Sequence, residues 1–275
     1  MSGQVSRVSH TGSFVVEQVS SALRELAEQY VMPRFRRLRD DEVMAKAHGD
    51  VVTIVDHEVE QALAPQLLAL LPGSRVVGEE ATAADPSLLN ELDQGWVWLL
   101  DPVDGTANFA AGREAFAMMV ALLHDGEAVA CWIYSPIGGQ MAVAELGSGA
   151  FIDGVAVRVA NADLDGLKGV VKTRYLPPDL VAALERGPRG LAAFDAGSGS
   201  AGIDYPALVA GQWRFLLYWR TLAWDHVPGS LFVTEAGGHV ARLDGSLYRA
   251  ADTRPGLLVA PSQEAWQAAR TLLVA

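Results

Sequence analysis

One short stretch near the middle of the chain, Trp96–Gly112 (WVWLLDPVDGTANFAAG), limits most strongly what the chain can fold into. Its first five residues, Trp96–Leu100, form a continuous apolar run, which is typical of a strand buried on both faces. Asp101 ends this run, and Asp104 follows three residues later. We therefore expect two carboxylates to lie together at the end of a buried strand.

The turn after this strand has two interpretations. Aspartate, proline and glycine are ordinary turn residues, so the two acids could serve the turn alone. Alternatively, the backbone amides of Gly105 and Thr106 point outward, as at the start of a helix, and bind phosphate beside acids that bind a hard cation. This stretch by itself does not separate the two interpretations.

Charge and composition narrow the possible partners. The 275 residues include 33 acidic and 21 basic side chains, which gives a formal net charge of −12. This charge argues against nucleic acid and against an anionic membrane surface as partners. A polyanionic substrate would therefore need bound divalent cations in the protein.

Cysteine use and hydropathy limit the compartment. Cys131 is the only cysteine, which excludes an intrachain disulfide and a cysteine-based zinc site. The N-terminus has no secretory pattern, and no apolar run reaches the length of a membrane span. We expect a cytoplasmic protein.

The spacing of apolar residues predicts two parts of different character. In the first part we expect helices over residues 12–35 and 56–71, the second with Asp56 as its N-cap, and a strand over residues 75–78. Short β-prone stretches joined by tight turns then predict an antiparallel meander. These stretches are Phe116–Leu123, Ala128–Tyr134, Gln140–Glu145, Ala150–Ile152 and Val155–Val159.

After a boundary near residues 161–167 strands and helices alternate, which is typical of an α/β unit. The expected strands are Val170–Tyr175, Ala192–Asp195, Trp213–Trp219, His239–Leu243 and Leu257–Ala260. The expected helices are Pro178–Glu185, Ala201–Ala210, Asp225–Ala236 and a last one after Ser262. We therefore expect an N-terminal half at residues 1–162 and a smaller C-terminal half at residues 163–275.

The segment Gly197–Gly202 is a literal G-x-G-x-x-G, the pattern of a dinucleotide-binding turn. Its context does not fit that function, because it comes late in the chain and the helix that follows it contains Pro206. We interpret it instead as a loop of small residues that lets a substrate approach the backbone.

Five acids stand next to apolar strand ends or at helix starts, and none has a lysine or arginine beside it in the sequence. They are Glu79, Glu80, Asp101, Asp104 and Asp225. Buried carboxylates without partners are too costly to keep unless a cation collects them. Ligands that are all oxygen suit Mg²⁺, Mn²⁺ or Ca²⁺.

Four segments resemble the inositol monophosphatase superfamily of Mg²⁺-dependent, lithium-sensitive phosphatases. They are Asp50–Asp56, Gly78–Glu80, Asp101–Phe109 and Trp224-Asp225 with Glu235–Gly238, in the order and spacing of the family. This resemblance covers nearly the whole chain. It implies a layered αβαβα sandwich of the α/β class, a homodimer and a small phosphorylated metabolite as substrate.

The resemblance also implies roles for individual residues. Glu79, Asp101 and the carbonyl of Val103 would hold one Mg²⁺, and Asp101, Asp104 and Asp225 a second, with a looser third ion on Glu79. Thr106, oriented by Asp56, would position the attacking water that the first ion and Glu79 supply. The remaining implied substrate contacts come from Asp104, Gly105, Thr106, Ser200, Ala201 and Asp225.

One position departs from the family. Seven residues before Asp225, inositol-selective members carry a glutamate that accepts sugar hydroxyls, and this chain has Tyr218. We therefore expect a substrate other than inositol 1-phosphate to be preferred, and Arg220 would favour a second anionic group if it points inward. The alternative substrates are a nucleotide bisphosphate, histidinol phosphate or a sugar phosphate. A different alternative is that the chain is a catalytically inactive family member that only binds a partner.

Overall fold

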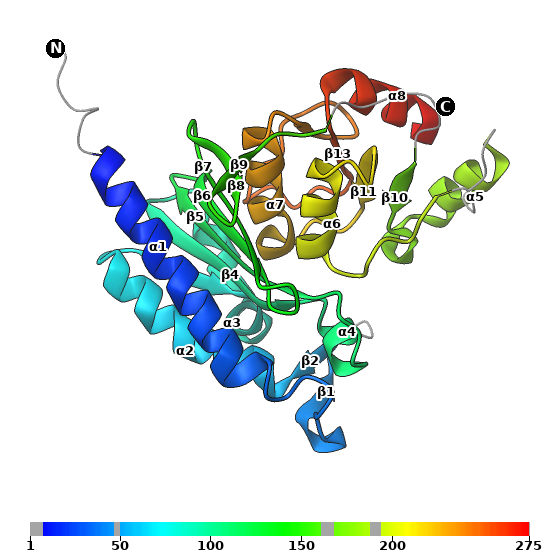
Figure 1. The fold of residues 1–275 in the computed structure, drawn as a ribbon. Helices are drawn as coiled ribbons and strands as arrows, with labels where there is room; N and C mark the ends of the chain where they lie inside the picture. Colours follow the sequence, from blue (N-terminus) through cyan, green and yellow to red (C-terminus); the bar gives the residue numbers. More distant parts are fainter. Residues whose placement is uncertain (1–7, 47–49, 161–167, 188–193, 275) are drawn as a thin grey trace, which may run out of the picture.

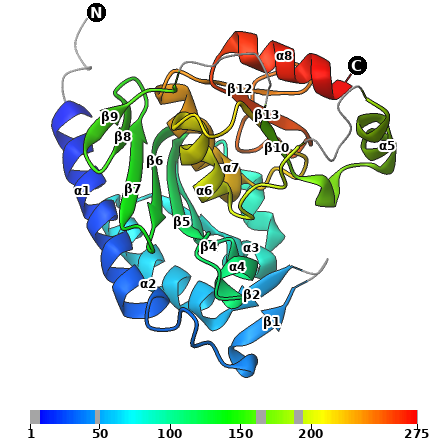
Figure 2. The ribbon, with the colours of Figure 1, turned by 45° about the vertical axis from the view of Figure 1, so that its right-hand side comes forward.

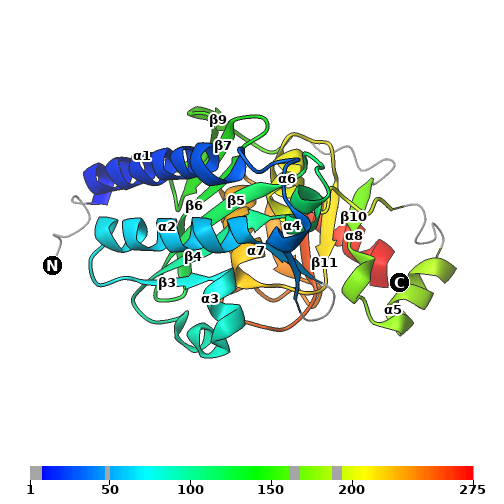
Figure 3. The same cartoon turned by 90° about the horizontal axis from the view of Figure 1, so that it is seen from below.

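A computed structural model gives the fold of the chain and describes residues 8–46, 50–160, 168–187 and 194–274. Helices and sheets alternate in five layers, which confirms the predicted αβαβα sandwich (Figures 1 and 3). Figure 2 shows the central helical layer between the two sheets. Among the described residues, no helix has both the length and the apolar character that crossing a membrane requires.

The larger sheet has seven strands in the order of the sequence. They are β3 (Arg75–Gly78), β4 (Trp96–Asp104), β5 (Ala117–His124), β6 (Glu127–Ser135), β7 (Gln140–Glu145), β8 (Gly149–Ile152) and β9 (Val155–Val157). Strand β3 is parallel to β4, and every other pair is antiparallel. The predicted meander is therefore correct.

Strand β5 shows why this sheet is covered on both faces. Side chains alternate between the two faces of a strand. Met119 and Leu123 belong to the apolar core between the two sheets, whereas Met118 and Val120 belong to the core beneath the outer helices. A strand that is apolar from Ala117 to Leu123 must be covered by a layer on each side.

The helices fill these layers. The outer face of the large sheet carries α1 (Val8–Leu26), the π-helical turn Ala27–Val31 and α2 (Ile54–Leu70), and the central layer holds α6 (Ala201–Val209) and α7 (Ala223–Glu235). The smaller sheet has the order β10 (Gly169–Val171), β11 (Phe215–Tyr218), β13 (Leu257–Ala260) and β12 (His239–Arg242). Its far face packs against α5 (Pro178–Arg186) and α8 (Gln263–Val274).

Short elements complete the fold near the end of β4. They are the hairpin β1 (Val43–Ala45) and β2 (Val51–Thr53), the helices α3 (Glu79–Ala84) and α4 (Thr106–Ala110), and the 3₁₀ turns Asp40–Glu42, Pro86–Glu91 and Thr173–Tyr175.

Several predicted boundaries are wrong. Strand β4 does not end before Asp101 but runs to Asp104, because a register shift between these two residues accommodates Pro102 in the ladder. The first helix begins at Val8 and becomes a π-helical turn after Leu26.

The predicted starts of two helices are also wrong. Thr53 caps α2, and Asp56 is the third residue of that helix, where its carboxylate accepts the backbone N–H of Thr53 at 2.8 Å. Asp225 lies inside the first turn of α7, which begins at Ala223.

The expected strand over residues 170–175 stops at Val171 and continues as the 3₁₀ turn Thr173–Tyr175. Half of the strand expected over residues 192–195 lies outside the described residues, and Asp195 makes an isolated bridge to Val170. The expected boundary near residues 161–167 also lies outside them.

Candidate active site

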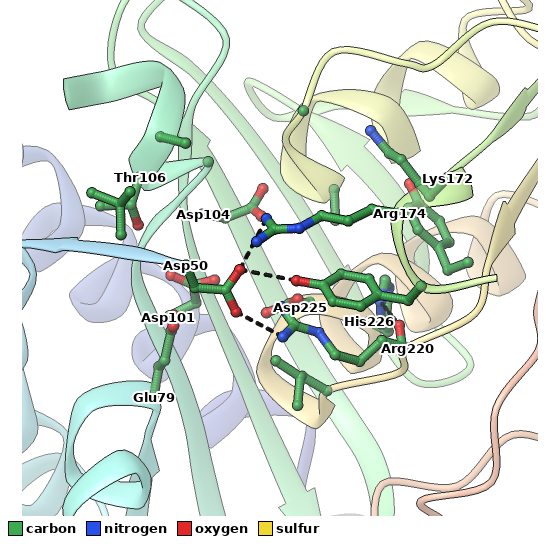
Figure 4. Close-up of a pocket in the computed structure, with 18 of the residues that line it drawn as sticks. Asp50, Glu79, Asp101, Asp104, Thr106, Lys172, Arg174, Arg220, Asp225 and His226 are labelled. Atoms are coloured by element: carbon green, nitrogen blue, oxygen red, sulfur yellow. Dashed lines mark hydrogen bonds and ion pairs between the residues drawn. The ribbon is translucent and has the colours of Figure 1, made fainter. Parts of the chain in front are cut away.

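Three carboxylates from three different elements meet at one end of β4. Glu79 begins α3, Asp101 lies in β4, and Asp225 lies in the first turn of α7. Each offers an oxygen atom, and these atoms all lie within 4.8 Å of one another. Figure 4 shows them in the pocket. The fold therefore brings together acids that are up to 146 residues apart (225 − 79) in the sequence.

A fourth carboxylate, Asp104, is fixed beside them by the small-residue loop. Its Oδ2 accepts the hydroxyl of Ser200 at 2.5 Å and the backbone N–H of Gly202 at 2.6 Å. A Cβ at residue 202 would lie 2.6 Å from the Cβ of Ala117, so the loop needs glycine to approach. The G-x-G-x-x-G segment thus serves to position an acid.

Behind the acids, Thr106 and Asp56 form a short hydrogen-bonded chain. The Thr106 Oγ1 lies 3.0 Å from Asp56 Oδ1 and 2.8 Å from the carbonyl oxygen of Val103. Asp56 is fully buried, and its other oxygen accepts the hydroxyl and the N–H of Thr53. The position of the Thr106 hydroxyl is therefore set from the protein interior.

The four acids and Thr106 line one pocket of about 300 Å³, the volume of a small-molecule site. Its opposite wall comes from the C-terminal half and carries Lys172, Arg174 and Arg220 (Figure 4). Arg174 and Arg220 contact Asp50, at 3.0 Å and 2.7 Å, and Lys172 pairs with Asp204 at 3.0 Å. An acidic wall thus faces a wall of paired basic side chains.

Negative charge is concentrated in the acidic wall, which consists of Glu79, Asp101, Asp104 and Asp225. Burial, together with the charge of Glu79, raises the pKa of both Asp101 and Asp225 well above the ordinary range, and burial also raises that of Asp104. The donor set consists of oxygen atoms, which hard divalent cations prefer. The residues present therefore fit a bound metal ion.

Lys46 is a site residue that the sequence analysis missed. Its ammonium donates to Glu79 at 2.8 Å and to Glu80 at 2.6 Å, so these two acids do have a basic partner, contrary to expectation. Glu80 lies in the interior, where Glu60 accepts its backbone N–H. Among the described residues, Lys46 pairs with Glu79 and Glu80 only. The pKa values of Asp101 and Asp225 stay well above the ordinary range, although the charge of Arg220 lowers that of Asp225.

Comparison with known proteins decides the family. The model of the inositol monophosphatase family matches residues 13–274. The chain belongs to the inositol monophosphatase family. It is 32% identical over 250 residues to an inositol-1-monophosphatase of Mesorhizobium japonicum, covering 82% of this chain and 87% of that protein.

Two further relatives come from Thermotoga maritima. A protein named fructose-1,6-bisphosphatase/inositol-1-monophosphatase is 29% identical over 198 residues, which cover 71% of this chain and 73% of that protein. A solved IMPase structure has a TM-score of 0.75 at 24% identity, covering 94% of this chain and 97% of that chain, which shows the shared fold. Inositol monophosphatases are metal-dependent phosphoric monoester hydrolases, and the predicted membership is confirmed.

Six of the seven substrate-binding residues expected for this inositol monophosphatase family member line the pocket, and Ser200 does not. Asp104, Gly105, Thr106, Ala201, Tyr218 and Asp225 line the pocket. Ser200 is 1% exposed and holds Asp104 rather than lining the pocket. The buried Tyr218 ring packs against both Tyr205 and His226, with ring centroids at 5.6 Å and 4.5 Å. Its hydroxyl has no hydrogen-bond partner among the described residues.

The pKa shifts predict how the metal-free protein responds to pH. The folded-state pKa values lie above the unfolded value of about 3.9 for Asp56, Asp101 and Asp225, and that of Asp56 is about 7. The folded state therefore binds protons more tightly than the unfolded state, so stability is lost as pH rises through these values. In EDTA we expect the Tm to fall between about pH 5 and pH 8.

Differential scanning fluorimetry checks this prediction. Added Mg²⁺ should raise the Tm more at pH 8 than at pH 6, because metal binding at the lower pH must first release protons from the carboxylates. A Tm that rises with pH in EDTA would contradict this account of the site.

Proposed function

We propose that the chain hydrolyses a small phosphate monoester with Mg²⁺ as its metal. The observation that carries this proposal is the meeting of Glu79, Asp101, Asp104 and Asp225 with Thr106 in one pocket. Divalent cations in such a site neutralise phosphate charge and lower the pKa of a bound water. We assign Glu79, Asp101 and the Val103 carbonyl to one ion, Asp101, Asp104 and Asp225 to a second, and Glu79 to a looser third.

Thr106 and Glu79 would act on the attacking water. A hydroxyl carries one proton and two lone pairs. When Thr106 donates its proton to Asp56 or to the Val103 carbonyl, its lone pairs remain able to accept a hydrogen bond from a water in the pocket. This orients the water, and the Glu79 carboxylate is the base that would take its proton.

Gly105 and the amides around it would hold the phosphate. Gly105 has a φ of +88°, and a Cβ there would lie 2.9 Å from the carbonyl oxygen of Ala115. This left-handed turn begins α4 directly at the pocket, so the N–H groups of Gly105 and Thr106 can donate to phosphate oxygens.

Tyr218 supports a substrate other than inositol 1-phosphate. A carboxylate at this position would accept sugar hydroxyls, whereas the Tyr218 hydroxyl is buried and only a flat, mostly apolar side chain borders the pocket. A carboxylate here would also lie near Asp104, Asp204 and Asp225, whose charges already raise the Tyr218 pKa in addition to burial.

Replacing Tyr218 by phenylalanine tests this description. We expect kcat/KM for every substrate to change by less than about threefold, because the hydroxyl contributes no contact to the pocket. The Tm should stay or rise, since an unpaired buried hydroxyl costs about 1–3 kcal/mol. A tenfold or larger loss of kcat/KM would show that the hydroxyl does contact the substrate.

A phosphate-release screen tests the proposed function. The panel contains inositol 1-phosphate, sugar mono- and bisphosphates, nucleoside monophosphates and bisphosphates, and histidinol phosphate, each with Mg²⁺. Sugar bisphosphates are included because the Thermotoga maritima relative is named for one. We expect turnover of at least one monoester at a higher kcat/KM than that of inositol 1-phosphate. No turnover on the whole panel would instead favour an inactive member that binds a partner.

A homodimer is also part of the proposal, as the family resemblance implies. Analytical ultracentrifugation of the full chain checks it against the 29.3 kDa of one chain.

A further inference from the structure

The wall opposite the acids carries a cluster that the proposed reaction does not use. Asp50 directly precedes β2, and three donors from the C-terminal half converge on it. Arg174 lies 3.0 Å from its Oδ1, the Tyr175 hydroxyl donates to the same oxygen at 2.9 Å, and Arg220 donates to Oδ2 at 2.7 Å. All of these residues line the same pocket as the acids.

The cluster is held in place by ring contacts. The Arg220 guanidinium lies 4.2 Å from the centroid of the Tyr175 ring, and that of Arg174 lies 5.2 Å from it. Such cation–π contacts fix the planes of the two guanidinium groups. The arginines are therefore positioned before any ligand arrives.

Two guanidinium groups contact one ionised carboxylate in this cluster. Burial raises the pKa of Asp50, but the hydrogen bonds and charges of Arg220, Tyr175 and Arg174 outweigh it and lower the pKa overall, so Asp50 is ionised. Its side chain is 24% exposed and those of Arg220 and Arg174 are 35% and 53% exposed, so a ligand in the pocket can reach all three.

Most of the hydrogen-bond accepting capacity of the Asp50 carboxylate is already used. A carboxylate has about four lone-pair sites, and the contacts with Arg174, Tyr175 and Arg220 take up three of them. Asp50 can therefore accept little from sugar hydroxyls. The Arg220 guanidinium meets Asp50 through Nη1, and a planar guanidinium group has a geometry that suits an oxyanion with several oxygens.

We propose that Arg174 and Arg220 form a subsite for a second phosphoryl group in the leaving part of the substrate, and that Asp50 fills this subsite until the substrate displaces it. This inference rests on the proposed function, because it assigns the substrate class of the same pocket. The dianionic phosphoryl group would contact both arginines, and the Asp50 side chain would turn toward solvent. A monophosphate substrate would leave Asp50 where it is.

Replacing Asp50 distinguishes a phosphoryl subsite from a cluster that only holds the two halves of the protein together. If the three residues only hold the halves together, then replacing Asp50 and replacing an arginine both lower kcat/KM for a bisphosphate. If Asp50 competes with the substrate, replacing Asp50 raises kcat/KM for a bisphosphate, whereas replacing an arginine lowers it.

The experiment compares substrates that share the scissile ester and differ by one phosphoryl group. The pairs are fructose 1,6-bisphosphate with fructose 1-phosphate, and adenosine 3′,5′-bisphosphate with adenosine 3′-phosphate. The quantity measured is the ratio of kcat/KM for the bisphosphate to that for the monophosphate. It is determined for the full chain, Arg220→Gln, Asp50→Asn and the control Arg37→Gln, which replaces an exposed arginine outside the pocket.

We expect a ratio of at least about ten for one pair in the unaltered protein, since charge-assisted contacts are roughly twice as strong as neutral ones. Arg220→Gln should lower that ratio about tenfold or more, Asp50→Asn should raise it, and Arg37→Gln should leave it unchanged. A ratio near one in the unaltered protein, or a ratio that falls in both Arg220→Gln and Asp50→Asn, would overturn the proposal.

A binding measurement separates failure of the subsite from failure of the proposed function. Calorimetric dissociation constants for the same pairs are measured on Asp225→Asn, for which we expect no turnover. If no monoester is hydrolysed by the unaltered protein, the proposed function is wrong, and the calorimetric preference still decides the subsite. Equal affinities for both members of each pair would overturn the subsite.

Discussion

Replacing Asp101 by asparagine is expected to lower kcat by about a thousandfold while it raises the Tm of the metal-free protein. Asp101 is 2% exposed, and Glu79, Asp104, Asp225 and Asp56 all raise its pKa in addition to burial. It is also the acid that the proposal assigns to both metal ions. Asparagine keeps the shape and can still accept the backbone N–H of Val103, so the variant should stay folded.

The opposite signs of the two effects make this variant informative. Kinetics at saturating Mg²⁺ gives the loss of activity, and thermal melting in EDTA gives the stability. Asp93→Asn, at an exposed position away from the pocket, is the matched control and should change neither. Retention of more than about a tenth of kcat would rule out Asp101 as a ligand of the catalytic metal.

Replacing Thr106 by alanine is expected to lower kcat about a hundredfold and to change KM by less than about threefold. The alanine variant loses the hydroxyl that lies 3.0 Å from Asp56 and 2.8 Å from the Val103 carbonyl, and with it the oriented acceptor for the attacking water. Because that contact matters most in the transition state, the loss falls on kcat.

Steady-state kinetics of Thr106→Ala and Thr106→Ser checks this role. Serine keeps the hydroxyl, so it should restore most of the lost activity. If instead Thr106→Ala raised KM and left kcat unchanged, Thr106 would only bind the phosphate.

The acidic wall could be predicted from the sequence because each acid adjoins an apolar run. Asp101 follows Trp96–Leu100, and Glu79 follows the short strand Arg75–Gly78. An apolar run indicates where a strand lies, and an acid that directly follows the run can be singled out without knowledge of tertiary contacts. Proline at position 102 was misleading, because the register shift next to it lets the strand continue to Asp104.

The basic wall could not be predicted in the same way. Arg220 and Asp50 are 170 residues apart, and Lys46 and Glu79 are 33 apart. No local pattern says which of the 21 basic side chains meets which acid once two sheets pack through a shared helical layer. Tyr218 shows the same limit, because its position in the pocket could be predicted but the burial of its hydroxyl depends on Tyr205 and His226.

The most direct test of the central claim is phosphate release by the full chain after dialysis against EDTA, measured before and after Mg²⁺ is added back. We predict that hydrolysis is lost in EDTA and returns with Mg²⁺, because the closely spaced buried and half-buried acids that line the pocket need a cation to coexist. Undiminished hydrolysis in EDTA would contradict a metal-dependent mechanism in this pocket.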